Sequence, residues 1–286
     1  MKKIAIITDT DSSLPPEMAS QYGIEQVPIT VHFGEETYTT GVDINDALLF
    51  EKVAKLNKLP TTSAPSTGMF SAAFQRAFDQ GADAIVCICV SSKVSSTYNS
   101  ALNARELFAD REIAVIDSLN LSMGQGFVVL AAAEAAQQGC SLEEITARAL
   151  DINNRAHTYA ALPTLKYLAM SGRVGKFVAG VADTFNIKPI LTIRDGKLDL
   201  LEKVRTQKAA IQRIINLTST SVAGKTVERL AIIHVNNENG ALALKDQLCA
   251  VIRCPSQVII AEFTAGLSVH AGSGVVGIVT VTGASS

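Results

Sequence analysis

The chain has 286 residues, of which 48% are hydrophobic and 18% are charged, and its formal net charge is −2 with an isoelectric point near 6.1. This length suits one large domain or two ordinary ones, each able to bury a core. The charge balance, the scarcity of aromatic residues and the absence of tryptophan argue against a nucleic-acid-binding protein. The apolar run at 127–136 is too short for a membrane-spanning helix, and no signal peptide is recognised, so a cytoplasmic location is expected.

The first half of the sequence alternates predicted strands and helices. Apolar strands and amphipathic helices are expected, in chain order, at 2–8, 46–58, 67–79, 84–90, 96–108, 112–117 and 123–138. Strands that are apolar throughout and separated by such helices predict a parallel sheet covered on both faces. Residues 1–152 are therefore predicted to form an N-terminal three-layer α/β domain.

The second half has a different pattern of elements, because its predicted strands follow one another with fewer helices between them. A helical segment is expected over 142–169, as one helix or as two that meet near Pro163. The later strands and helices are expected at 187–193, 197–205, 207–221, 229–235, 239–252, 257–263 and 277–283. Residues 153–286 are therefore predicted to form a C-terminal domain with a mixed or antiparallel sheet and helices on one side.

The five cysteines show neither a metal-binding nor a disulfide spacing. Cys87 and Cys89 stand inside the apolar run "IVCICV", which is typical of a buried strand. All five are therefore expected to be core thiols.

Two stretches rich in hydroxyl side chains each precede a predicted helix: "TTSAPS" at 61–66 and "SSKVSST" at 91–97. Ser66 or Thr67 is expected to cap the first helix, and Ser95 or Ser96 the second. The second stretch follows a predicted parallel strand, so it should lie at the carboxyl edge of the sheet, where such sheets bind ligands. Hydroxyl donors beside helix N-termini suit a small anion such as a carboxylate. The alternative, that these residues only cap helices and form turns, stays open.

Other stretches suggest weaker hypotheses. An apolar strand that ends in Asp9-x-Asp11 resembles the phosphotransfer loop of a Mg²⁺-dependent phosphatase, with Asp9 as nucleophile, but the late acidic pair that such a Mg²⁺ site needs is not seen. Arg173 and His270 each stand among small residues that allow close approach of the backbone. No metal-ligand spacing is recognised, so neither a metal nor a cofactor is expected.

Taken together, these stretches resemble the DegV family of bacterial fatty-acid-binding proteins, and the resemblance runs nearly end to end. The segments that carry it, in chain order, are "ITDTDSSLP", "VPITVHFGEETY", "TTSAPS", "SSKVSSTYNSA", "VIDSLNLSMGQG", "LKYLAMSGRVG", "FNIKPILTIRDGKL" and "HAGSGVVG". The second hydroxyl stretch differs from the family pattern at Ser96, which stands where the family has glycine. If that glycine needs a positive φ, the serine would strain the loop. Ser171 and Ser273 replace a glycine and a proline of the family pattern.

The resemblance implies a lipid carrier without turnover of its own, with a long acyl chain such as palmitate, stearate or oleate buried between two α/β domains. It implies that Thr62 and Ser95 bind the carboxylate, with Ser63 and Ser96 close by. A lipid-filled sensor or adaptor is the remaining alternative.

The same resemblance places two further residues near the carboxylate end, namely His270 and Arg173. It assigns Arg173 to presentation of the fatty acid to a separate fatty-acid kinase, which makes acyl phosphate for phospholipid synthesis.

Overall fold

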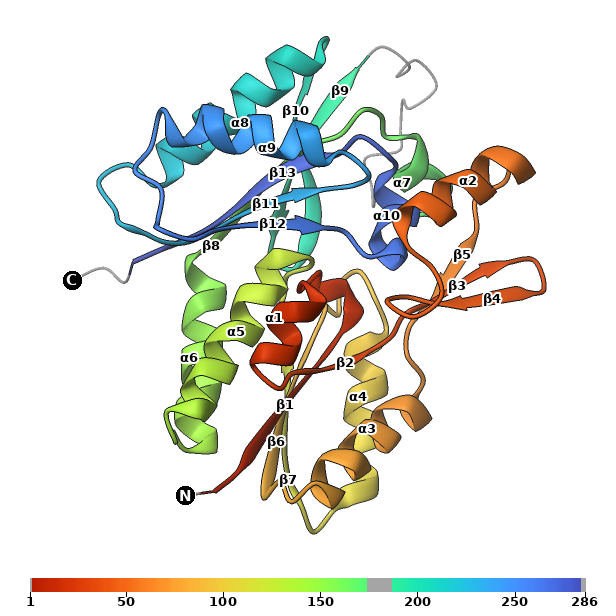
Figure 1. The fold of residues 1–286 in the computed structure, drawn as a ribbon, viewed down its shortest axis with the longest axis vertical. Helices are drawn as coiled ribbons and strands as arrows, with labels where there is room; N and C mark the ends of the chain where they lie inside the picture. Colours follow the sequence, from red (N-terminus) through yellow and green to blue (C-terminus); the bar gives the residue numbers. More distant parts are fainter. Residues whose placement is uncertain (1, 174–186, 284–286) are drawn as a thin grey trace. The chain divides into compact units, whose positions relative to one another are not determined.

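The computed structural model describes residues 2–173 and 187–283, which form two compact units (Figure 1). Unit 1 comprises Met1–Asp43 and Thr62–Asn154, and unit 2 comprises Ile44–Thr61 and Arg155–Ser286. The predicted fold class is confirmed, since one unit holds a parallel sheet and the other a mixed sheet. The division at residue 152 stays a prediction, and the sequence analysis did not anticipate that 44–61 groups with unit 2.

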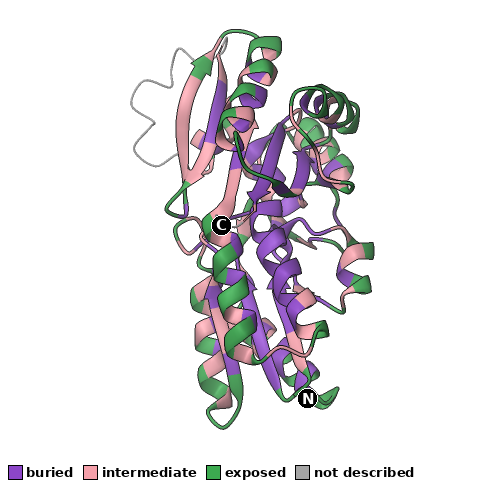
Figure 2. Ribbon diagram, turned by 90° about the vertical axis from the view of Figure 1, so that its left-hand side faces the viewer, coloured by how far each residue is buried: buried purple, intermediate pink, exposed green. Residues whose placement is uncertain are grey.

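Unit 1 is built on a four-stranded parallel sheet with the strand order β2-β1-β6-β7. Its strands are β1 (Ile4–Asp9), β2 (Glu25–Val27), β6 (Ala84–Cys89) and β7 (Glu112–Asp117). Every residue of β6 is buried, as expected for a central strand that helices cover on both faces (Figure 2).

Helices cover both faces of this sheet (Figure 1). One face carries α3 (Thr67–Asp79) and α4 (Thr97–Arg105, continued by the turn η2, Glu106–Phe108), and the other carries α5 (Met123–Gln137) and α6 (Leu142–Arg155). The short helix α1 (Pro16–Gln21) joins β1 to β2. Phe70, Phe74 and Phe78 recur every four residues, so they share one face of α3 and enter the core. Helix α5 is apolar nearly all round, which explains why it is almost wholly buried.

The small three-stranded sheet with the order β4-β3-β5 was not predicted from the sequence, whereas helix α2 was. Its strands β3 (Thr30–Phe33), β4 (Glu36–Thr39) and β5 (Thr61–Ser63) are three or four residues long, too short to give a clear alternating pattern. Helix α2 (Asp46–Leu56) was predicted, and Asn45 caps it by accepting a hydrogen bond from the Leu48 amide.

Unit 2 holds a six-stranded sheet with the order β10-β9-β8-β13-β11-β12, in which only the β11–β12 pair is parallel. The strands are β8 (Ala156–Ala161), β9 (Lys188–Arg194), β10 (Lys197–Val204), β11 (Val227–His234), β12 (Val258–Glu262) and β13 (Val276–Thr282). Helices α8 (Gln207–Ser221) and α9 (Glu238–Cys249) pack on one face of this sheet and complete its core. The shorter helices are α7 (Lys166–Met170) and α10 (Ala265–Ala271).

The helical prediction over 142–169 is wrong in its middle. Helix α6 ends at Arg155, and the next six residues form β8, which pairs with β13 on one side and β9 on the other. The alanines at 156, 160 and 161 favour helix locally, but two ladders of backbone hydrogen bonds outweigh that preference.

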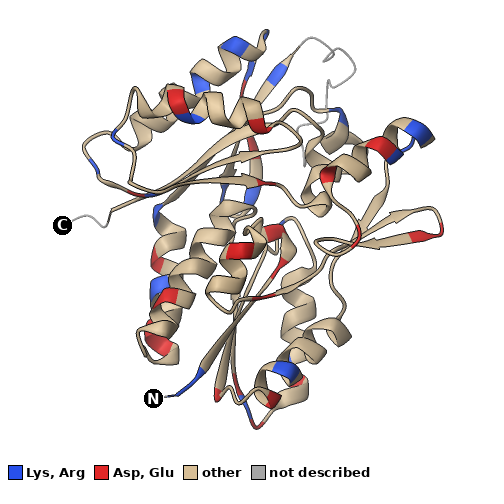
Figure 3. Ribbon diagram, in the orientation of Figure 1, with Lys and Arg blue, Asp and Glu red and all other residues tan. Residues whose placement is uncertain are grey.

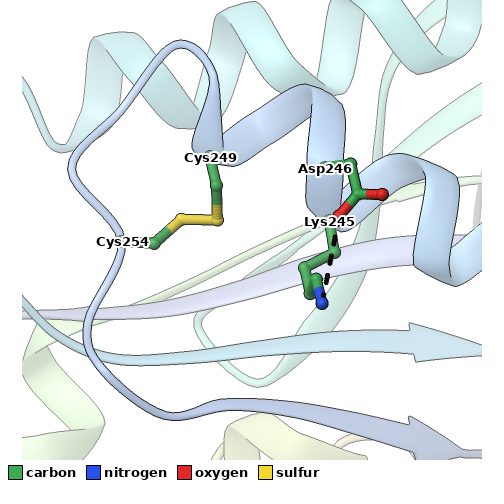
Figure 4. Close-up of a disulfide and its surroundings, with 4 residues drawn as sticks. All are labelled: Lys245, Asp246, Cys249 and Cys254. Atoms are coloured by element: carbon green, nitrogen blue, oxygen red, sulfur yellow. Dashed lines mark ion pairs between the residues drawn. A yellow bond between two sulfur atoms is a disulfide. The ribbon is translucent and has the colours of Figure 1, made fainter.

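The expectation for the cysteines is also wrong in part. Cys249 and Cys254 form a disulfide that closes the loop after α9 (Figure 4). The prediction holds for Cys87 and Cys89, which are buried thiols in β6. The disulfide was not predicted because two cysteines five residues apart match no disulfide spacing used in the sequence analysis. The chain turns after α9, and this turn brings Cys254 back to Cys249.

The distribution of charged residues agrees with the nearly balanced charge of the sequence. Acidic and basic residues of the described part of the chain are scattered along the ribbons of both units (Figure 3). Among the described residues, no helix combines the length and hydropathy needed to cross a bilayer.

Gly272, which follows α10, should not tolerate a side chain. Its φ is +81°, and a Cβ there would lie 2.3 Å from a ring carbon of Tyr167 in α7. We expect Gly272→Ala to lower the free energy of unfolding by about 2–5 kcal/mol, since backbone strain and overpacking add. The control is Gly224→Ala, where φ is +72° but nothing lies within 4 Å. Urea unfolding of both variants measures the difference, and equal losses would contradict the packing argument.

Candidate functional site

The first hydroxyl stretch leads from β5 into α3. Ser66 is the N-cap of α3, and its hydroxyl accepts a hydrogen bond from the Met69 amide, so the predicted cap is confirmed. Ser63 is exposed, and its hydroxyl lies 3.0 Å from Nε2 of His32 in β3. Thr62, which precedes Ser63, is half-buried. The stretch is therefore held at both ends.

The second hydroxyl stretch turns from the end of β6 into α4. The carbonyl of Ser91 accepts hydrogen bonds from the amides of Val94 and Ser95, both at 3.1 Å. The Ser95 hydroxyl accepts a hydrogen bond from the Thr97 amide at 3.3 Å and lies 2.8 Å from the Thr97 hydroxyl. If Thr97 donates, the proton of the half-buried Ser95 hydroxyl is left to donate to an anion.

The expected strain at Ser96 is not present. Ser96 has φ −83° and ψ 0°, which is accessible to any residue, so glycine is not required for this loop conformation. Ser171 likewise has φ −91°, and Ser273 is not among the residues with positive φ. The three departures from the family pattern therefore cost no backbone strain.

Asp9, at the end of β1, belongs to a buried polar network. Its carboxylate is fully buried and accepts hydrogen bonds from the amides of Asp11 (3.0 Å) and Val90 (2.8 Å) and from Nε2 of Gln125 (3.1 Å). Burial raises the pKa of Asp9 to about 6, although these three donors oppose the change. Both carboxylate oxygens thus already bind groups of this chain.

The two predicted residues in unit 2 lie within electrostatic reach of each other. Burial lowers the pKa of His270, in α10, to about 4, and the positive charge of Arg173 contributes. His270 is therefore neutral at pH 7 and offers an imidazole N–H rather than a charge. Arg173 is exposed and donates a hydrogen bond to the Ser171 carbonyl at 2.7 Å. The two residues that follow Arg173 in the family motif, at 174 and 175, lie outside the described residues.

A second buried carboxyl lies in unit 2, where α2 meets α10. Asp46 is 2% exposed and accepts a hydrogen bond from the Ser268 hydroxyl at 2.8 Å. Burial raises the pKa of Asp46 to about 7 and the negative charge of Glu262 adds to the increase, whereas hydrogen bonds from Ser268 and the Asn236 amide oppose it. Sequence analysis gave no sign of this group, because Ser268 lies 222 positions away along the chain.

Comparison with known proteins identifies the family. A family model described as "Uncharacterised protein, DegV family" matches residues 3–283, which is nearly the whole chain. The chain belongs to the DegV family. A DegV domain-containing protein of Halalkalibacterium halodurans is 33% identical over 97% of this chain and 98% of its own length. The protein DegV of Bacillus subtilis is 32% identical over 96% and 98%.

Solved structures of DegV proteins share the fold of this chain. A DegV family protein from Thermus thermophilus, described by its fatty acid binding, superposes with a TM-score of 0.92 at 28% identity, covering 98% of this chain and 99% of that one. DegV from Bacillus subtilis, described as a fatty acid binding protein, has a TM-score of 0.88 at 31% identity, covering 99% and 100%.

The predicted site residues of this DegV family member divide into two groups. Thr62, Ser63, Ser95 and Ser96 belong to unit 1, near the starts of α3 and α4, which pack against each other. His270 and Arg173 belong to unit 2. Their roles stay predictions. Sequence analysis missed His32 as the partner of Ser63, since the only signal was a histidine in a polar alternating stretch.

Proposed function

We propose that this protein binds a long-chain fatty acid such as palmitate, stearate or oleate and presents it to a fatty-acid kinase. Membership of the DegV family and likeness to two structures described by fatty acid binding support the first part. The observation that carries the proposal is the pair of hydroxyl stretches at the starts of α3 and α4, where anions are favoured. In this proposal the protein is a cytoplasmic carrier subunit without turnover or cofactor of its own.

The acyl chain supplies most of the binding free energy. Burying about a dozen methylenes at roughly 0.8 kcal/mol each contributes on the order of 10 kcal/mol before association costs are subtracted. We propose the space between the two domains as the place of this chain, as the family resemblance implies. The buried carboxylate then needs hydrogen bonds, because leaving it unpaired costs several kcal/mol.

The carboxylate in this proposal is held by neutral donors. The hydroxyls of Thr62 and Ser95 bind its oxygens, with Ser63 and Ser96 nearby, and charge-assisted bonds of this kind contribute about 1.5–3 kcal/mol each. His270 adds a neutral N–H donor, in keeping with its lowered pKa. Neutral donors leave the carboxylate available to a kinase, because no salt bridge has to be broken before phosphorylation.

The phosphatase alternative gains no support from the geometry. Its nucleophile would be Asp9, but that side chain has no exposed surface, and both oxygens accept backbone hydrogen bonds within unit 1. A phosphate ester would have to displace these contacts before it could react.

Recovery of the ligand tests the first part of the proposal. Native mass spectrometry of the purified protein, before and after addition of oleate or palmitate, should show one fatty acid per chain. A protein that stays empty under both conditions contradicts the proposed function.

Arg173 provides a test of the second part. We expect Arg173→Ala to retain oleate affinity within about threefold, since Arg173 is exposed, and to lower the rate of kinase-dependent acyl-phosphate formation at least tenfold. The matched control is Arg253→Ala, which removes an exposed arginine elsewhere in unit 2. Loss of oleate binding in Arg173→Ala would place this side chain at the carboxylate instead. Absence of acyl phosphate even with the wild-type protein would favour the lipid-filled sensor.

A further inference from the structure

The Asp-x-Asp stretch at the end of β1 contacts the residue that immediately precedes the second hydroxyl stretch. Oδ2 of Asp9 accepts the amide hydrogen of Val90, the first residue after β6, at 2.8 Å. Strands β1 and β6 are adjacent and parallel, so their carboxyl ends meet at one edge of the sheet. The buried carboxylate therefore fixes the point at which the chain leaves the sheet toward α4.

Only a short path of hydrogen bonds separates Asp9 from Ser95. The residue after Val90 is Ser91, whose carbonyl accepts the Ser95 amide at 3.1 Å. Ser91 is fully buried and its own amide donates to the Asn120 carbonyl at 2.8 Å. A shift of Val90 away from Asp9 is therefore passed on to the turn that places the Ser95 hydroxyl.

We propose that Asp9 is a positioning residue of the fatty-acid carboxylate site, which fixes the 90–97 turn so that Ser95 presents its hydroxyl to the ligand. This inference rests on the proposed function. It gives the Asp-x-Asp stretch a role in binding without any reaction at Asp9, and Gln125 of α5 contributes by donating to the same oxygen.

The chemistry of the side chain explains why aspartate is required. The two oxygens of Asp9 face three donors, with the Asp11 amide on one side and the Val90 amide and Gln125 on the other. Asparagine has a single acceptor oxygen, so one of the two backbone amides would face an NH₂ group. In either orientation of Asp9→Asn, its NH₂ group faces a backbone N–H, so the side chain has to move and the start of the 90–97 turn is disturbed.

Asp117, at the end of β7, offers a matched control. Its Oδ1 accepts the amides of Ser92 and Leu119, both at 3.1 Å, and asparagine can keep this oxygen in place. We expect Asp9→Asn to weaken oleate binding at least about tenfold and Asp117→Asn by no more than about threefold, measured by titration with a fluorescent fatty acid. A second control, Val86→Ala in the buried middle of β6, should lower the melting temperature and leave oleate affinity unchanged.

A measurement on the wild-type protein covers the case in which Asp9→Asn does not fold. When the Asp9 carboxyl is titrated between pH 4.5 and 8 and followed by NMR, the amide signals of Val90 and Ser95 should move with the same midpoint. Amides that ignore this titration overturn the inference.

The outcomes separate the two proposals. If wild-type and Asp9→Asn proteins bind oleate equally well, the positioning role is overturned and the proposed function stays intact. Wild-type protein that takes up no fatty acid overturns both. Selective loss of affinity in Asp9→Asn, with Val86→Ala unaffected at a similar melting temperature, supports the role.

Discussion

Replacing Asp46 by asparagine should make the protein more stable than wild type above pH 7 and remove that advantage below pH 4. The cause is the buried carboxyl of Asp46, whose pKa rises from 3.8 to about 7 on folding. A group whose pKa is raised on folding contributes stability that is fully present below its unfolded pKa and is lost as the pH rises through its folded pKa. Asparagine does not titrate, so it does not incur this loss.

The expected size follows from the pKa values. A change from 3.8 to about 7 corresponds to roughly 4 kcal/mol between pH 4 and pH 8. The free energy of unfolding of Asp46→Asn minus that of wild type should therefore rise by up to about 4 kcal/mol across this window. Using the difference removes the contributions of the other titrating groups, which the two proteins share.

Urea unfolding of both proteins at several pH values between 4 and 8 measures this difference. Ser268→Ala is the companion variant, because the Ser268 hydroxyl donates to Asp46 and favours its ionised form. Removing this hydrogen bond should raise the pKa of Asp46 further, so the loss of stability with rising pH should occur at higher pH than in wild type. A pH-independent difference between Asp46→Asn and wild type would mean that Asp46 does not titrate in this range.

Replacing both Thr62 and Ser95 by alanine should weaken oleate binding by about 3–6 kcal/mol if the proposed function is right, since each loses one charge-assisted hydrogen bond to a desolvated carboxylate. Each single substitution should cost about half of this. The fold should survive, because both side chains are only half-buried, Ser66 caps α3, and the bond from the Thr97 amide to the Ser95 hydroxyl is long, at 3.3 Å.

Fluorescent fatty-acid titration and thermal unfolding together measure this prediction. Ser100→Ala is the matched control, since it removes a hydroxyl from α4 one turn beyond the candidate site. If the melting temperature of the double variant falls as far as that of a core truncation, the two hydroxyls serve only the local structure. Unchanged oleate affinity in the double variant would remove them from the carboxylate site.

Elements with a strong local pattern could be predicted from the sequence. Helix α8 begins and ends at the predicted residues, because Thr206 caps it and its apolar side chains recur with the helical period. Asp195 and Gly196, which join β9 to β10, both adopt positive φ, as an Asp-Gly pair in a two-residue hairpin turn favours. The family resemblance supplied the candidate site residues.

Features that depend on distant contacts could not be predicted. Strand β8 has a composition that favours helix, and only its neighbours β13 and β9 make it a strand. The role of Asp9 depends on Val90, which is 81 positions away, and that of Asp46 on Ser268, 222 positions away. A local pattern contains no record of such pairs, so their discovery required the tertiary structure.

The grouping of residues 44–61 with unit 2 has a consequence for dissecting the protein. The polypeptide passes from one unit to the other three times, after Asp43, after Thr61 and after Asn154. A fragment that ends near residue 152 would therefore carry α2 without the helix that supplies Ser268, and would expose Asp46, which is buried in the intact chain. The two halves of the sequence are thus not the two folding units, and a fragment of unit 2 needs residues 44–61 to be complete.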